Sequence, residues 1–119
     1  MKSLLVVAHG SRRAQSNDEV RQLVDKMSGM PHEFTEIKAA FLELAEPLIP
    51  GGIRELIANG AREVVVLPYF LSAGRHVVED IPADVKVVQD EKPDIKITIA
   101  SYLGASDEVM DILFKQANG

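Results

Sequence analysis

Short, continuous apolar segments that alternate with amphipathic segments constrain the fold of this chain most strongly. Residues 4–8 read Leu-Leu-Val-Val-Ala and residues 64–67 read Val-Val-Val-Leu, with no polar side chain in either run. Strands of this composition are typical of parallel sheets that are covered by helices on both faces. Each such run is followed by a stretch with apolar residues at helical spacing, so the pattern predicts alternating strands and helices.

Four strands and four helices are expected, in the order β-α-β-α-β-α-β-α. The strands are predicted at residues 4–8, 34–42, 63–69 and 95–100. In the second strand Glu36 and Lys38 interrupt the apolar pattern, which favours a position at the edge of the sheet. This alternation predicts a three-layer α/β fold, a four-stranded parallel sheet with helices on both faces, as a single domain over residues 1–119.

The sequence contains signals for where the helices begin and where one of them is disturbed. Residues 16–19, Ser-Asn-Asp-Glu, match a capping box for the first helix, and Pro47 suits the first turn of the second. The third helix is expected over residues 76–89 with a disturbance at Pro82, and Ser106 is expected to cap the fourth. The residues of the fourth helix that are predicted to face the core are spaced by four: Val109, Leu113 and Ala117.

The composition excludes several classes of function. The chain has no cysteine, which rules out disulfides, thiolate metal sites, iron–sulfur clusters and a cysteine nucleophile, and fits the cytoplasmic location that we expect. Its net charge is −5 and it has no tryptophan, so nucleic-acid binding is not expected. No apolar run approaches the roughly 20 residues that cross a bilayer, so no membrane contact is expected. Neither a Walker loop nor a Gly-x-Gly-x-x-Gly motif is present, so nucleotide cofactors are not expected.

Three polar side chains follow the carboxyl ends of the predicted strands. His9 comes directly after the first strand, Glu43 after the second, and His76 after the loop that leaves the third. In open parallel sheets ligands bind beside the carboxyl ends of the strands, so these side chains are expected to converge. Two imidazoles and a carboxylate suit a divalent first-row metal such as Co, Ni, Fe or Zn. Each histidine taken alone also suits a structural role as a cap of its loop, and His32 is interpreted as a surface residue.

Three motifs of the chain resemble those of a known enzyme family. They are Val-Ala-His-Gly-Ser-Arg at residues 7–12, Phe-Leu-Glu-Leu-Ala-Glu-Pro at 41–47, and a segment with Gly-Arg-His at 74–76 and Asp-Ile-Pro at 80–82. These motifs resemble the sirohydrochlorin chelatases of the CbiX type, and the length resembles the short archaeal form of these class II chelatases. The resemblance implies a chelatase-like fold with flavodoxin-like winding. One segment differs, because Ala105 and Ser106 stand where the family often has His-Pro.

The resemblance also implies an activity and a site. The activity would be the ATP-independent insertion of a divalent metal into sirohydrochlorin, with Co²⁺ expected for cobalamin synthesis and Ni²⁺ or Fe²⁺ as the other candidates. His9 and His76 would bind the metal, and Glu43 would complete the catalytic site, with either Glu43 or His9 as base. The expected partners are sirohydrochlorin, the metal ion and a second copy in a homodimer, with no cofactor beyond the substrate metal. Sirohydrochlorin is expected to contact the flanking loops at Ser11, Arg12, Ser72, Gly74 and Arg75.

Two other functions remain open on the sequence alone. A non-catalytic metal or tetrapyrrole carrier could use the same residues, although Glu43 adds a base that a carrier does not need. A histidine-dependent phosphoryl-transfer enzyme could use His9 as a nucleophile beside Arg12 and Arg13. Histidine phosphatases, however, have an arginine before the histidine, and Ala8 stands there in this chain.

Overall fold

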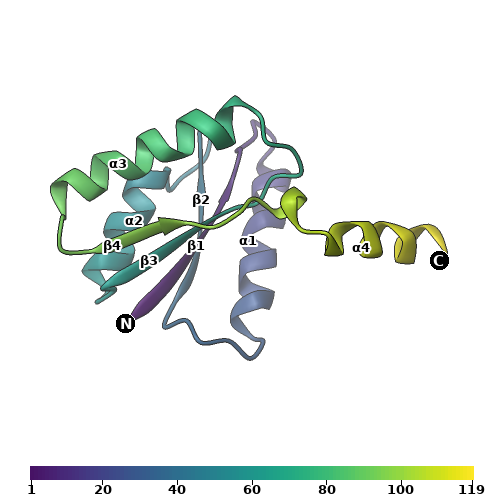
Figure 1. Ribbon diagram of the computed structural model, residues 1–119, viewed down its shortest axis with the longest axis horizontal. Helices are drawn as coiled ribbons and strands as arrows, with labels where there is room; N and C mark the ends of the chain where they lie inside the picture. Colours follow the sequence, from purple (N-terminus) through teal and green to yellow (C-terminus); the bar gives the residue numbers. More distant parts are fainter.

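The computed structural model describes residues 1–75 and 77–119 (Figure 1). Strands and helices alternate along the chain in the predicted order, with one π-helical turn (η1) and one 3₁₀ turn (η2) added. The elements are β1 (Lys2–Ala8), α1 (Ala14–Ser28), β2 (Ile37–Phe41), α2 (Ile49–Ala58), β3 (Glu63–Pro68), η1 (His76–Asp80), α3 (Ile81–Glu91), β4 (Lys96–Ile99), η2 (Leu103–Ala105) and α4 (Glu108–Ala117).

A parallel sheet with the strand order β2-β1-β3-β4 lies at the centre of the fold. β1 pairs with β2 on one side and with β3 on the other, and β4 pairs with the outer side of β3. The two central strands are thus the two continuous apolar runs of the sequence, because only they are flanked by strands on both sides. The edge position predicted for β2 is confirmed.

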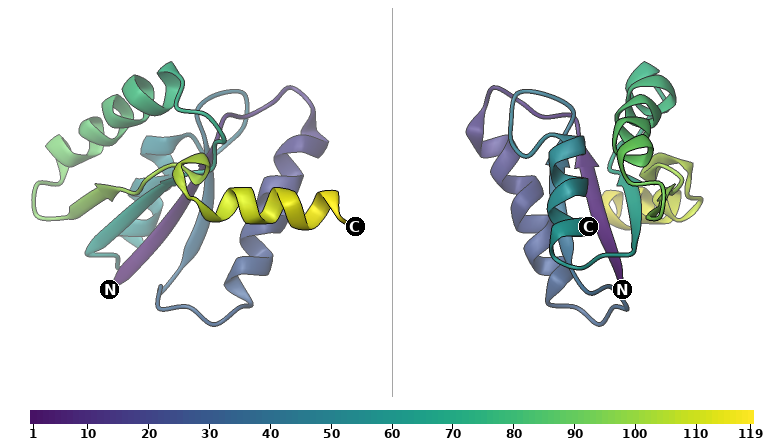
Figure 2. Two further views of the ribbon diagram at one scale, coloured as in Figure 1. Left: turned by 45° about the vertical axis from the view of Figure 1, so that its right-hand side comes forward. Right: turned by 90° about the vertical axis from the view of Figure 1, so that its left-hand side faces the viewer.

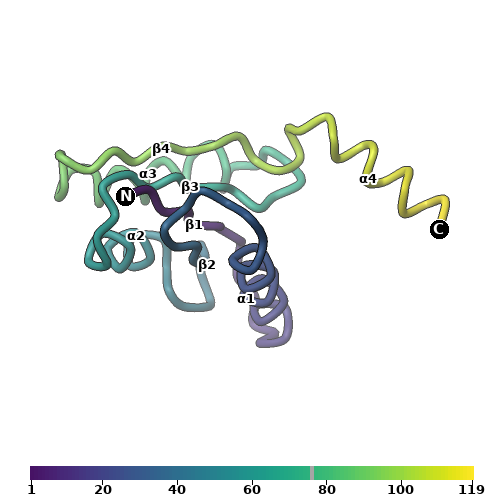
Figure 3. Tube along the Cα trace, turned by 90° about the horizontal axis from the view of Figure 1, so that it is seen from below, coloured from purple at the N-terminus to yellow at the C-terminus, as the bar shows by residue number. Residues whose placement is uncertain are grey.

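Helices cover both faces of the sheet, so the predicted α/β fold is confirmed. On one face α2 and α3 bury the larger core, in which Leu5, Ile53 and Ile81 have no exposed surface. On the other face α1 packs on β1 and β2 through Val24, against Leu4. Figure 3 shows α1 and α2 on opposite sides of these strands. Among the described residues, no helix combines the length and the apolarity needed to cross a bilayer.

The start of α1 differs from the capping-box prediction. The helix begins at Ala14, so residues 16–19 lie inside it, and the side chain of the N-cap residue Arg13 makes no capping hydrogen bond to the helix backbone. The predicted cap is wrong because Ser16, its capping residue, already lies in the first helical turn, where its N–H donates to the Arg13 carbonyl at 3.1 Å. The amide of the next residue, Asn17, makes two hydrogen bonds to the backbone of Ser11. The first turn of α1 is therefore tied to the preceding loop by Asn17 rather than ended by a capping box.

The start of α2 also differs from the prediction, because a different proline occupies its first turn. The helix begins at Ile49 and holds Pro50 in its first turn, where a missing N–H has no cost. Pro47, which was predicted for that role, remains in the loop because its carbonyl accepts a hydrogen bond from the Phe41 N–H at 2.9 Å. The predicted disturbance at Pro82 is confirmed, since η1 ends and α3 begins beside it.

The helix α4 departs most from prediction. Val109, Leu113 and Ala117 were expected to face the core, but none of the ten residues of α4 is buried. The predicted capping role of Ser106 is confirmed in part: its Oγ accepts a hydrogen bond from the Glu108 N–H at 3.3 Å, although Asp107 is the N-cap residue. Figures 1 and 2 show α4 running away from the sheet rather than back across it, so the expected burial of this helix is wrong. Helical spacing predicts an apolar stripe but not which surface covers it.

Candidate active site

The strand β1 delivers His9 to the carboxyl edge of the sheet. The strand is fixed in the core, where Val7 has no exposed surface, whereas the side chain of His9 directly beyond it is 44% exposed. The chain then turns through Gly10, whose φ is +93°. A Cβ on Gly10 would lie 1.8 Å from the carbonyl oxygen of Glu43, so only glycine lets the loops after β1 and β2 touch at this point.

Glu43 meets His9 across the ends of β1 and β2. The parallel pairing continues past the strands, because the Leu42 N–H donates to the Ala8 carbonyl at 3.0 Å and the Glu43 N–H to the His9 carbonyl at 3.2 Å. The side chains follow this register, and His9 Nε2 lies 3.5 Å from Glu43 Oε1. The structure therefore brings together two of the three side chains that the sequence singled out.

The loop that carries Glu43 is held against α1 by Arg21, which sequence reasoning did not identify. Arg21 Nη2 donates to the Glu46 carbonyl and Nη1 to Asp18 Oδ1, each at 3.0 Å. The guanidinium also lies 5.1 Å from the ring centroid of the fully buried Phe41. The loop that carries Glu43 is thus anchored to the neighbouring helix α1.

The loop after His9 is closed by Asn17, a second residue that the sequence did not single out. The side chain is 6% exposed, its Nδ2 donates to the Ser11 carbonyl at 2.8 Å, and its Oδ1 accepts the Ser11 N–H at 2.9 Å. The Ser11 hydroxyl accepts a hydrogen bond from the Arg13 N–H at 3.0 Å, and Arg12 is exposed beside it. A buried asparagine in the first helical turn is the signal that could have revealed this contact.

A hollow of about 240 Å³ opens next to Glu43 and is lined by residues from the loop after β2 and from η1 and α3. Burial, and secondly the charge of Asp80, raise the pKa of Asp84 above its ordinary value. The two aspartates lie on either side of Pro82 at a spacing of four, a pattern that the sequence reasoning did not use. The lining residues are Leu42, Glu43, Asp80, Ala83 and Asp84.

The loop after β3 carries the remaining predicted contacts. Ser72, Gly74 and Arg75 are all exposed, and Arg75 Nε lies 3.7 Å from Glu79 Oε2. The predicted metal ligand His76 lies outside the described residues. Within the described part of the chain, no group of three His, Cys, Asp or Glu side chains is arranged to hold a metal ion.

Apolar side chains are exposed in the loops after the strands and in η1. Three of them follow the ends of strands and one lies in η1, and Leu71 is the most exposed of the four at 70%. Exposed apolar groups of this kind mark surfaces that bind apolar ligands or partners. An imidazole beside a carboxylate is an arrangement that can bind a metal ion and accept a proton. The four residues are Leu44, Tyr69, Leu71 and Val78.

Comparison with known proteins identifies the family to which the chain belongs. The CbiX family model matches residues 3–118. The sirohydrochlorin cobaltochelatase of Methanocaldococcus jannaschii is 28% identical over 143 residues, which cover 100% of this chain and 99% of the relative. The sirohydrochlorin ferrochelatase of Priestia megaterium is 28% identical and is matched over 44% of its own length. The crystal structure of the chelatase SirB from Bacillus subtilis subspecies spizizenii in complex with cobalt superposes with a TM-score of 0.89 at 26% identity, over 98% of this chain and 50% of SirB. This chain belongs to the CbiX family.

Proposed function

We propose that this chain inserts a divalent metal ion, Co²⁺ in the first place, into sirohydrochlorin without ATP. The observation that carries the proposal is the contact of His9 with Glu43 at the carboxyl edge of the sheet, in a chain of the CbiX family. Residues 1–119 are assigned to a single chelatase domain. Relatives matched along the whole of this chain are named for the same reaction, which supports the assignment.

Metal insertion has to remove water from the ion and two N–H protons from the macrocycle. A neutral imidazole binds divalent first-row metals and releases them again, so His9 is assigned as a metal ligand. Glu43 is assigned as the base, because a carboxylate 3.5 Å away can take up a proton while the imidazole remains on the metal. His76, from the third motif, is assigned as the second ligand on the strength of the sequence motif.

The tetrapyrrole would lie against the apolar side chains at the strand ends. Leu44, Tyr69 and Leu71 are exposed there and offer a surface for the macrocycle face. The protein carries a net charge of −5, so attraction of the substrate carboxylates has to be local. The exposed Arg12 and Arg75 supply that local charge, and hydroxyl and backbone groups of the same loops supply hydrogen bonds, from Ser11, Ser72 and Gly74.

The choice of metal and the assembly are further parts of the proposal. Relatives named for cobalt and for iron support Co²⁺ and Fe²⁺ as substrates, and Ni²⁺ rests on the resemblance to the short archaeal form. A homodimer would enclose the flat macrocycle better than one open edge of a four-stranded sheet. The cytoplasmic location stays a prediction from the sequence.

The absorption spectrum of sirohydrochlorin tests the reaction directly. With Co²⁺ and catalytic amounts of protein, conversion to the metallated spectrum should be faster than with Co²⁺ alone and should turn over many times. A carrier would instead change the spectrum in proportion to the protein added, without turnover, and that result would contradict the proposal. Repeating the assay with Fe²⁺ and Ni²⁺ ranks the metals.

Replacement of Glu43 tests its assigned role as base. Glu43→Gln keeps the size of the side chain but removes the proton acceptor, so the rate of insertion should fall by about 100-fold or more. The matched control is Glu46→Gln, on the same loop, where the hydrogen bond to Arg21 uses the backbone carbonyl and is kept. Equal rates for the two variants would remove Glu43 from the mechanism.

A further inference from the structure

Leu44 has a backbone conformation that is unfavourable for a leucine. Its φ is +66°, and among the described residues it is the only non-glycine residue with a positive φ. In this left-handed region the Cβ atom of an L-residue comes too close to a carbonyl oxygen of the backbone, so glycine, asparagine or aspartate is the usual occupant. A bulky leucine here strains the backbone directly beside Glu43.

The loop after β2 fixes this conformation from both sides. Before Leu44, the Glu43 N–H donates to the His9 carbonyl at 3.2 Å. After it, the Pro47 carbonyl accepts the Phe41 N–H at 2.9 Å, which brings the chain back beside the end of β2. These bonds explain why residue 44 is left-handed, but a glycine would meet the same requirement without strain. The course of the loop therefore does not explain the leucine.

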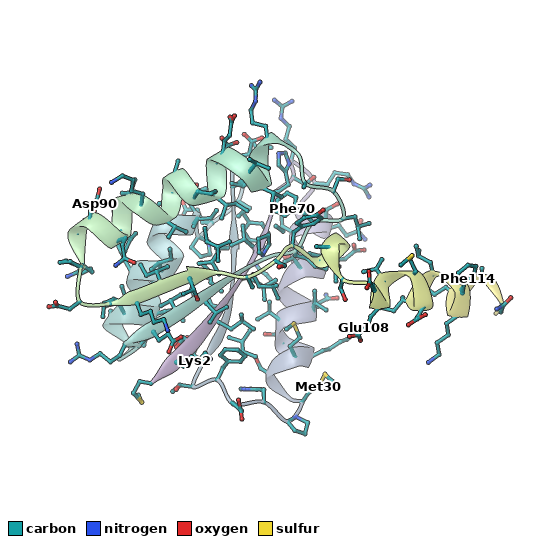
Figure 4. The ribbon with its side chains drawn as sticks, viewed as in Figure 1. Lys2, Met30, Phe70, Asp90, Glu108 and Phe114 are labelled. Atoms are coloured by element: carbon teal, nitrogen blue, oxygen red, sulfur yellow. The ribbon has the colours of Figure 1, made fainter. Side chains whose placement is uncertain are left out.

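The leucine side chain does not compensate for the strain by packing in the core. It is 54% exposed. By contrast, Leu42 and Phe70, from the loops that follow β2 and β3, pack against the larger core, and Figure 4 labels Phe70 at the carboxyl end of β3. Leu44 thus combines a strained backbone with an exposed apolar side chain, and neither stabilises the folded chain.

The position next to Glu43 limits what this side chain can touch in a complex. Consecutive Cα atoms are about 3.8 Å apart, so residue 44 lies within one residue length of the assigned base. The N–H protons that the base removes are at the centre of the macrocycle, whereas the carboxylates of sirohydrochlorin are at its periphery. A side chain this close to the base therefore meets the apolar face of the ring, and a leucine suits that contact.

We propose that Leu44 is a substrate-binding residue, whose side chain packs on the face of the macrocycle beside the protons that Glu43 removes. The strained backbone holds the side chain in place before the substrate arrives, so its apolar surface is buried only in the complex. The loss of stability in the free protein is offset by affinity for the tetrapyrrole. The inference rests on the proposed function and deepens it, because it names one residue that sets the affinity for sirohydrochlorin.

Titration with metal-free sirohydrochlorin, followed by its absorption spectrum, tests the contact. Leu44→Ala keeps the strained conformation but removes most of the side chain, so the Kd should rise about five- to 20-fold. Leu44→Met keeps an apolar side chain of similar size, so the Kd should stay within about two-fold of wild type. The matched control is Leu48→Ala, at the end of the same loop, where a leucine that is 47% exposed has an ordinary φ of −73° and the Kd should not change.

Two further measurements separate binding from strain. Leu44→Ala should raise the KM for sirohydrochlorin with little change in kcat, whereas Glu43→Gln should lower kcat. Leu44→Gly should weaken binding as much as Leu44→Ala does. Without ligand, Leu44→Gly should melt about 2–5 °C higher than Leu44→Ala, because glycine relieves the strain.

Three results would overturn the inference and leave the proposed function standing. The first is an unchanged Kd for Leu44→Ala when the wild-type protein binds and metallates sirohydrochlorin. The second is an equal loss of affinity in Leu48→Ala, which would show that the effect is not specific to residue 44. The third is a Leu44→Gly variant that melts no higher than Leu44→Ala, which would mean that the backbone is not strained there. Wild-type protein that binds no sirohydrochlorin would overturn the proposed function together with the inference.

Discussion

Gly10 decides how closely the loops after β1 and β2 approach, and hence where His9 and Glu43 meet. Both its φ of +93° and the 1.8 Å that would separate an added Cβ from the Glu43 carbonyl oxygen exclude a side chain. Gly10→Ala should lower the free energy of unfolding by about 1–3 kcal/mol, measured by urea denaturation. It should also slow metal insertion, because relief of the clash moves Glu43.

Gly51→Ala is the control for this substitution. Gly51 lies in α2 and has no atom within 4 Å of an added Cβ. Alanine there should stabilise the protein by about 0.5–1 kcal/mol, because it is the better helix former. If both variants changed stability in the same direction, the close approach at Gly10 would not be a constraint.

Asn17 holds the loop after His9 through two hydrogen bonds from a nearly buried amide. Asn17→Ala leaves the Ser11 N–H and carbonyl without these partners, so the protein should lose about 1–3 kcal/mol of stability. The exposed Asn59, which bonds to Glu36 Oε1 at 3.0 Å, is the matched position, and Asn59→Ala should change stability by less than about 0.5 kcal/mol. Similar losses of stability in the two variants would show that the buried hydrogen bonds of Asn17 contribute no more than the exposed one of Asn59.

At the scale of elements, α2 and α3 are joined on the outside of the larger core by a two-bond ion pair. Arg54 Nη2 lies 2.7 Å from Glu91 Oε1, and Arg54 Nε lies 3.0 Å from Glu91 Oε2. The hydrogen bonds from Arg54 lower the pKa of Glu91 below its ordinary value, against a smaller opposing effect of burial. A carboxylate with a lowered pKa stabilises the folded state above its unfolded pKa, and this contribution disappears as the pH falls through the folded pKa.

Glu91→Gln should therefore lower the melting temperature at pH 7, and this effect should be smaller at roughly pH 3, because the contribution of the ionised carboxylate is lost as the pH falls through its lowered pKa in the folded state. The control is Asp90→Asn, which removes an exposed pair with Lys86 within α3 and should have a smaller effect at pH 7. Scanning calorimetry at the two pH values measures both. A Glu91→Gln effect that is the same at pH 3 and pH 7 would contradict the ionic origin.

Some elements could be predicted from the sequence because their signals are local. The runs at residues 4–8 and 64–67 are apolar throughout, and this placed both central strands and hence the end at which His9 emerges. Glu43 follows the edge strand β2, which was predicted from a weaker, interrupted apolar pattern. The start of α1 could not be predicted from the capping-box pattern, because the helix extends past residues 16–19 to Ala14 and encloses that pattern. The burial of α4 could not be predicted either, since spacing within a helix does not identify the surface that covers it.

At the scale of the whole molecule, the fold accounts for where chemistry can occur. Parallel strands end at one edge, so residues far apart in the sequence meet there, as His9 and Glu43 do at 3.5 Å. The hollow next to Glu43, with Asp80 and Asp84, was not foreseen, because it depends on how η1 and α3 sit against the loop after β2. The predicted strands located the carboxyl edge of the sheet, whereas the hollow at that edge depends on how the helices and loops pack against one another.

The rate of Co²⁺ insertion into sirohydrochlorin by the His9→Ala variant tests the central claim most directly. His32→Ala is the matched control, since His32 is an exposed histidine whose Nδ1 accepts the Phe34 N–H and which lies before β2 rather than after a strand. With both variants folded, we predict a rate about 100-fold or more below wild type for His9→Ala and a near wild-type rate for His32→Ala. Wild-type turnover by His9→Ala would contradict the account.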